Sequence, residues 1–193
     1  EFITNTNGIC LTEKVAKKFF EATSMSDLSW SIDAATPHTH RKLRRLDTFD
    51  LVTDNLRRWI KLREKYGGKE KHKVCIYNNI NMINVDEMTL MVKQAREWCV
   101  DKMVMLPTYD QAGVVQLGEL MLCEKNLKVF KKASEEAMAY ANSVGYPLHY
   151  SKSFDTAPPS MEKLQAQNAE FSKTAPLISL DLPKRLHKSD PEV

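Results

Sequence analysis

The sequence lacks cysteines at metal-binding spacing. Its four cysteines are Cys10, Cys75, Cys99 and Cys123, and the closest pairs are 24 residues apart. Neither a CxxC pair nor a metal knuckle can be formed at that spacing, which favours reduced thiols with structural roles. Reduced thiols are typical of the cytoplasm, so we expect a cytoplasmic protein that holds no metal through its own residues.

Long apolar runs and a large surplus of one charge are also missing. No run approaches the roughly 20 apolar residues that a membrane helix needs, and no signal peptide is recognisable. The 28 Lys and Arg against 25 Asp and Glu leave a formal net charge of +3. This balance argues against a dedicated nucleic-acid-binding protein but allows a local basic patch. We therefore expect no membrane and no dedicated nucleic-acid partner.

One stretch carries the clearest structural pattern. Residues 28–33 alternate between apolar and polar side chains, which predicts a strand with one face of each kind. Thr36 and Pro37 then supply a capping hydroxyl and a first-turn proline for a helix, and a second helix begins after Asp47 or Thr48. If the apolar strand face packs on helices, the polar face lines a barrel interior, where Ser and Asp suit a polar ligand.

Strand and helix patterns alternate along the chain, which is long enough for one domain with a sizeable core. Strands are predicted at 2–6, 28–33, 74–80, 103–106 and 146–150, and helices at 12–23, 84–98 and 124–144 besides the pair that follows Thr36. In the helix that starts at Asn84, Glu87 stands at the position of a capping box. Such alternation is typical of βαβ units in a parallel sheet. We expect one domain over 1–150 and a Pro-rich extension or tail over 151–193.

Polar residues follow four of the predicted strands. They are Thr6 and Asn7, Ser31 and Asp33, Asn79 and Asn81, and residues 108–110. In βα folds ligands bind at the carboxyl ends of the strands, so these residues predict a shared site. The competing interpretation is that strand ends run into loops, which are polar in any protein.

Other candidate metal and anion sites have weaker support in the sequence. His38 and His40 are two positions apart on a helix and do not share a face, which argues against a metal site. The pair Gly67 and Gly68 lacks the spacing of a phosphate-binding loop. The basic run 41–45 is interpreted as a solvated helix face, with an anion contact as the alternative.

The segments ITNTNG, SIDAAT, RKLRRLDTFDLVTDNLRRW, INVDEM and VDKMVMLP follow one another in this order. Their order and spacing resemble those of the radical S-adenosylmethionine (SAM) enzymes, most closely the branch whose members often carry an additional C-terminal cluster domain. The resemblance covers about 3–107. It implies an α/β fold, a partial (βα) barrel with parallel strands, of which this chain supplies the third to sixth in an N-terminally truncated form.

The resemblance also implies eight cofactor-binding residues and no particular catalytic residue. They are Thr6, Asn7, Ser31, Asp33, Asn79, Asn81, Leu106 and Pro107. The first four would approach the amino acid or ribose of SAM, the two asparagines its ribose and carboxylate, and the last two its adenine. Hydroxyls and amides suit a zwitterionic nucleoside, and an apolar edge suits its base.

The sequence departs from the family at the cluster. The CxxxCxxC loop that supplies three thiolates to a 4Fe–4S cluster is absent, and the four cysteines cannot replace it at that spacing. The family's second-strand Gly-Gly-Glu-like segment is missing as well, and both would lie upstream of Glu1. A cluster is therefore expected only if its ligands come from outside this chain.

Three hypotheses follow. In the first, the chain is part of a radical SAM core that cleaves SAM to a 5′-deoxyadenosyl radical, which abstracts a substrate hydrogen; it supplies cofactor and substrate contacts and is inactive alone. In the second, a degenerate or split barrel acts as a non-catalytic binding or assembly module. In the third, the chain is an unrelated βα-barrel enzyme. The first two leave the edge of strand 2–6 open, so we expect a partner chain, self-association or the tail to cover it.

Overall fold

The computed structural model describes residues 2–108 and 120–151. The strands are β1 (Phe2–Thr6), β2 (Ser26–Ser31), β3 (His72–Ile80), β4 (Lys102–Pro107) and β5 (Leu148–Tyr150). The helices are α1 (Glu13–Ala22), α2 (Pro37–Arg44), α3 (Phe49–Arg63), α4 (Gly68–Lys71), α5 (Met88–Glu97) and α6 (Leu127–Ser143), with short 3-10 turns η1 (Glu64–Tyr66) and η2 (Val85–Glu87). Within the two described stretches, no helix is both long and apolar enough to cross a membrane.

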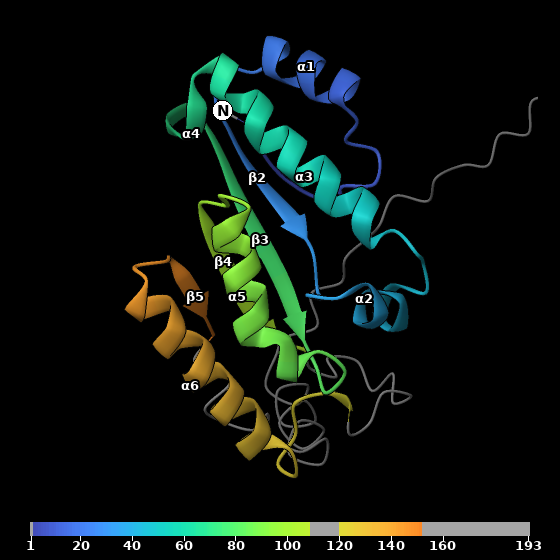
Figure 1. Ribbon diagram of the computed structural model, residues 1–193, viewed down its shortest axis with the longest axis vertical. Helices are drawn as coiled ribbons and strands as arrows, with labels where there is room; N and C mark the ends of the chain where they lie inside the picture. Colours follow the sequence, from blue (N-terminus) through green and yellow to red (C-terminus); the bar gives the residue numbers. More distant parts are fainter. Residues whose placement is uncertain (1, 109–119, 152–193) are drawn as a thin grey trace, which may run out of the picture. The chain divides into compact units, whose positions relative to one another are not determined.

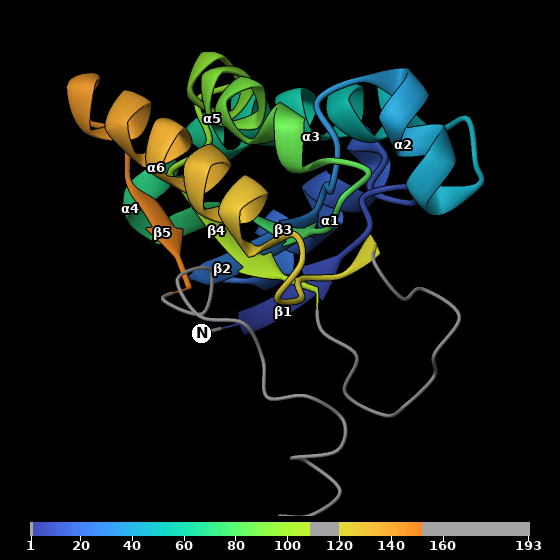
Figure 2. The same ribbon diagram turned by 90° about the horizontal axis from the view of Figure 1, so that it is seen from below.

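The five strands form one parallel sheet in the order β1-β2-β3-β4-β5. Each strand therefore pairs with the next one along the chain, as the alternation of strands and helices predicts. Figure 1 shows the strands and the helices that connect them, and in Figure 2 helices α3, α5 and α6 lie on the same side of the sheet. A parallel sheet with helices on one side is the wall of a partial (βα) barrel, and the fold matches a partial radical SAM-like barrel.

The apolar face of β2 forms the centre of the core. Leu28 and Trp30 are buried against α1 and α3, where Phe20 and Trp59 lie with ring centroids 4.6 Å apart. Burial of each such side chain stabilises the fold by about 1.5–3 kcal/mol. This packing confirms that the apolar side of the predicted strand faces the helices.

The opposite face of the sheet carries the alternate side chains. Ser31 pairs in register with Tyr77, and Tyr77 pairs with Val104. Asn79 pairs with Leu106 on the neighbouring strand. Register partners in a parallel sheet project to the same side, so these side chains share the face that the helices leave uncovered.

Some predictions of local structure differ from the fold. Gly67 and Gly68 join η1 to the short helix α4. The predicted capping box is wrong, because Asn84 makes no side-chain cap bond at the start of η2. Its amide and the Glu87 carboxylate instead bind the neighbouring loop after β2, which offers better partners than their own helix. The helix predicted over 124–144 begins at Leu127.

Candidate functional site

The turn after β1 is fixed by short hydrogen bonds. The Thr6 hydroxyl accepts from the Gly8 amide at 3.0 Å, and the Asn7 side-chain oxygen accepts from the Ile9 amide at 3.1 Å. From α3, the Asn55 amide donates to the carbonyls of Gly8 and Ile9. The Asn7 amide nitrogen stays at the surface, so the turn is held rigid while one donor remains available.

Asp33 connects the ends of two strands. It is only 7% exposed, and one carboxylate oxygen accepts from the Asn79 backbone amide at 2.7 Å while the other pairs with the Arg44 guanidinium. Both oxygens are therefore occupied within the protein. The pair also corrects the interpretation of run 41–45 as a wholly solvated face, because Arg44 turns back toward the sheet.

The loop after β3 is tied to the loop after β2 by Asn84, which is fully buried. Its amide nitrogen donates to the carbonyls of Asp33 at 2.6 Å and Asn79 at 2.9 Å, and its oxygen accepts from the Asn81 amide at 2.7 Å. The Asn81 side-chain oxygen accepts from the Ile83 amide. Asn84 thus sets the geometry of the carboxyl ends of both strands.

Glu87 holds the start of α2. Its carboxylate accepts three hydrogen bonds of 2.7 Å, from the Ala35 amide and the hydroxyls of Thr36 and Thr39. Gln94 of α5 donates to the Ala35 carbonyl at 2.8 Å. Charge-assisted bonds of this kind are stronger than neutral ones, so α2 keeps a fixed position beside the sheet edge.

A pocket of about 190 Å³ opens beside this edge. Its polar wall contains Asn7, Ser31, His40 and Arg44, and its remaining lining residues are Ile9, Leu46, Thr48 and Val52. Burial lowers the pKa of the His40 imidazole below its usual 6.5, which favours the neutral ring at pH 7. The ring also lies 3.0 Å from the Thr48 hydroxyl. The pocket therefore combines amide, hydroxyl and guanidinium groups with an apolar side.

A second group of side chains lies on the uncovered face of the sheet next to this pocket. Tyr77 and Leu106 are 37% and 38% exposed, and they flank Asn79 across β3 and β4. Among the described residues, the side chains of Ser31 and Asn79 have no hydrogen-bond partner. Two polar groups free to bind a ligand thus stand beside two apolar surfaces.

The eight predicted binding residues divide by where the structure places them. Asn7, Ser31, Asn79 and Leu106 reach the pocket or the uncovered face. Thr6, Asp33 and Asn81 use their side-chain oxygens in internal hydrogen bonds. Pro107 is buried and pairs with Ile80, which places it on the helix-covered side. Their roles toward a cofactor remain predictions.

Sequence reasoning missed several residues of this edge. Tyr77 could have been found from the alternation within β3, because it shares the parity of Asn79. Arg44, Asn84 and Glu87 gave no such signal, since their partners in the loop after β2 lie between 11 and 52 residues away in the sequence. Contacts of that kind depend on the tertiary fold and not on local periodicity.

The described residues offer no ligand set for an iron–sulfur cluster. The four cysteines are free, and within 2–108 and 120–151 no three His, Cys, Asp or Glu side chains are grouped to hold a metal. Burial also raises the pKa of the Cys75 thiol to about 12, which disfavours the thiolate that a metal requires. A 4Fe–4S cluster does not fit this part of the chain.

Solved structures share the fold. No family model matches the sequence, and no curated protein matches it. Native anSMEcpe with bound AdoMet and the Kp18Cys peptide matches with a TM-score of 0.52 and 18% identity, over 77% of this chain and 39% of that one. Histidine-tagged anSMEcpe with bound AdoMet gives the same score and identity over 77% of this chain and 37% of that one. The chain spans less than two-fifths of the length of these structures, and the likeness is one of fold.

Proposed function

We propose that this chain binds S-adenosylmethionine (AdoMet) at the carboxyl edge of its sheet, as part of a radical SAM-type core. The observation that carries the proposal is the meeting of Asn7 and Ser31, from the ends of neighbouring strands, in one pocket. That edge is where βα folds bind ligands. The fold is that of anSMEcpe, whose structures contain bound AdoMet, which supports the choice of ligand.

The free groups suit the parts of this ligand. Asn7 and Ser31 offer a donor amide and a hydroxyl to the polar amino-acid portion, and Asn79 offers an amide to the ribose. Tyr77 and Leu106 offer adjoining apolar surfaces to the adenine. Asp33, Asn84 and Glu87 act behind them as positioning residues, because their side chains are used within the protein.

Bound in such a core, AdoMet supplies the 5′-deoxyadenosyl group for hydrogen abstraction from a substrate. That chemistry requires a cluster, for which the described residues hold no ligand set. We therefore assign to this chain cofactor and substrate contacts and no electron-transfer step. The chain alone is expected to be inactive.

The same absence of a ligand set among the described residues supports a second candidate, a non-catalytic binding or assembly module. β1 pairs with β2 on one side only within the described sheet, and Ile3 on it is 72% exposed. An open edge of this kind accepts a further strand. A covering segment from a partner chain, a second copy or the tail remains a prediction.

Isothermal titration calorimetry of AdoMet into the full chain tests the proposal. Ser31→Ala removes one hydroxyl from the pocket and is expected to weaken binding about three- to tenfold, the effect of one hydrogen bond. Ser143→Ala is the matched control, because its hydroxyl bonds the Tyr140 carbonyl on exposed α6, and it should bind as the wild type does. Equal effects of the two substitutions would contradict the site. Absence of any binding by the wild type would leave only the assembly module.

A further inference from the structure

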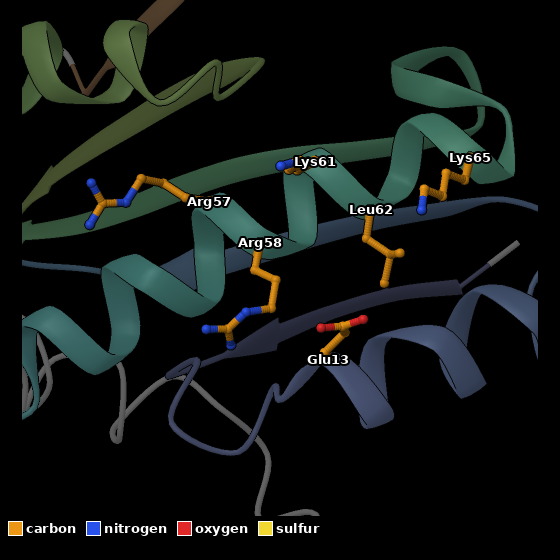
Figure 3. Close-up of a pocket in the computed structure, with 6 residues that line it drawn as sticks. All are labelled: Glu13, Arg57, Arg58, Lys61, Leu62 and Lys65. Atoms are coloured by element: carbon orange, nitrogen blue, oxygen red, sulfur yellow. The ribbon is translucent and has the colours of Figure 1, made fainter.

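A basic groove lies on the helical layer, away from the proposed cofactor site. It has a volume of about 490 Å³ and is lined by Glu13 of α1 with Arg57, Arg58, Lys61, Leu62 and Lys65. Figure 3 shows the cationic side chains along α3 and η1, with Glu13 across from them on α1. The pocket at the carboxyl edge of the sheet, which holds Asn7 and Ser31, is lined from this helix and its cap by Val52 and Thr48. The two sites therefore lie along different parts of α3.

The positive charge is concentrated in this part of the sequence. Residues 57–73 contain eight Lys or Arg and two Glu, a net charge of +6, whereas the whole chain carries +3. The rest of the chain is therefore net negative. A cationic segment creates a local positive potential that is not apparent from the small net charge of the whole chain.

The groove cations differ in whether they already have a partner among the described residues. Arg57 pairs with Asp54, and Arg58 donates to the Asn55 side chain. Within the described part of the chain, Lys61 and Lys65 make no ion pair. They stand one helical turn apart, about 6 Å, and Arg58 lies one turn before Lys61.

The one carboxylate that lines the groove has its own cationic partner. Glu13 pairs with Lys17 at 2.7 Å, and the pKa of its carboxyl lies below the usual value because of this hydrogen bond, then the charge of Lys17, with Arg58 and Lys65 adding to it. The groove thus has a surplus of donors at fixed helical spacing above an apolar floor, Leu62.

We propose that this groove binds an acidic amphipathic helix of a partner protein, with carboxylates spaced by three, four or seven residues. Carboxylates at that spacing would face Arg58, Lys61 and Lys65, and apolar side chains on the same face would contact Leu62 and the lysine stems. The proposal does not depend on AdoMet binding.

Charge and shape favour this ligand over other polyanions. Single-stranded nucleic acid binds by stacking its bases on aromatic side chains, and none lines the groove. The Glu13 carboxylate would lie against a continuous phosphate backbone, whereas a peptide can place its anions to either side of it. An anionic membrane is bound through a wide apolar helix face, whereas Leu62 is the one apolar residue among those that line the groove.

Fluorescence anisotropy of the full chain with a labelled synthetic helical peptide tests the proposal, with Glu at i, i+3 and i+7 and Leu on the same face. Lys61→Glu with Lys65→Glu should weaken binding about tenfold or more, because two attractions become repulsions. The matched control is Lys128→Glu with Lys131→Glu, two exposed positions on α6, which should change binding less than about twofold. Glu13→Gln should strengthen binding, which an unfolded variant could not do.

Three results would overturn the inference. The first is an equal loss of affinity in both double variants, which would show a non-specific charge effect. The second is equal binding of a peptide with Lys in place of Glu. The third is tighter binding of polyuridylate or of phosphatidylserine vesicles than of the acidic peptide. The proposed contact also requires affinity to fall from about 0.05 to about 0.3 M salt.

Discussion

Gly8 sits where the chain leaves β1 and has no room for a side chain. Its φ of +75° lies in the left-handed region, and a Cβ there would be 2.3 Å from the Trp30 ring and 3.2 Å from Val52. Trp30 is fully buried and cannot move without disturbing the core. The position of Asn7 at the pocket therefore depends on the residue that follows it.

Substitution of Gly8 by Ala is expected to cost about 2–4 kcal/mol of unfolding free energy, from overpacking and backbone strain together. Gly145→Ala is the control, because its φ is +64° but nothing lies within 4 Å of its Cβ, so strain alone should cost about 1–2 kcal/mol. Urea denaturation measures both. Similar losses at the two glycines would contradict the close contact with Trp30.

At the same scale, sequence could identify Ser31 and Asn79 as available polar groups because alternation assigns a side to each strand residue. It could not distinguish them from Asp33 and Asn81. All four are polar residues at strand ends, and only the structure shows that the latter two are occupied, Asp33 by Arg44 and Asn79, and Asn81 by the Ile83 amide of its own turn.

At the scale of elements, α2 depends on a side chain that follows β3. Glu87 joins Ala35, Thr36 and Thr39 across about 50 positions of sequence. Glu87→Gln keeps the shape but turns one acceptor oxygen into a donor that faces other donors. We expect a loss of about 1–3 kcal/mol in stability and weaker AdoMet binding, since His40 and Arg44 on α2 line the pocket.

Glu135→Gln on exposed α6 serves as the control for this substitution and should leave both quantities unchanged. Stability is read from urea denaturation and affinity from calorimetry. A Glu87→Gln variant with wild-type stability and affinity would show that α2 is held in place by other contacts.

The elements themselves were largely predictable. Thr36 accepts the expected cap bond from the Thr39 amide, and all five strands occur in the predicted order. The capping box at Asn84 failed because the box and a long-range contact use the same residue types. Residues 109–119 and the expected tail beyond Ser151 lie outside the described residues.

At the scale of the whole molecule, the parallel strand order follows from the alternation of strands and helices along the sequence. The meeting of the strand ends at one pocket follows from the pairing of neighbouring strands in the sheet. α3 connects the two proposed sites, with Val52 at the pocket of the sheet edge and Arg57 and Lys61 in the basic groove. The nearest lining residues along this helix, Val52 and Arg57, are five positions apart, about 8 Å. Because the two pockets share no lining residue, we expect them to bind independently.

Amide hydrogen exchange, followed by mass spectrometry with and without AdoMet, tests the central claim most directly. Binding at the carboxyl edge predicts slower exchange in 6–9, 31–36 and 79–84 when AdoMet is present, with no change in 57–65. Unchanged exchange in those three segments at a saturating AdoMet concentration, or protection confined to 57–65, would contradict a nucleoside site at this edge.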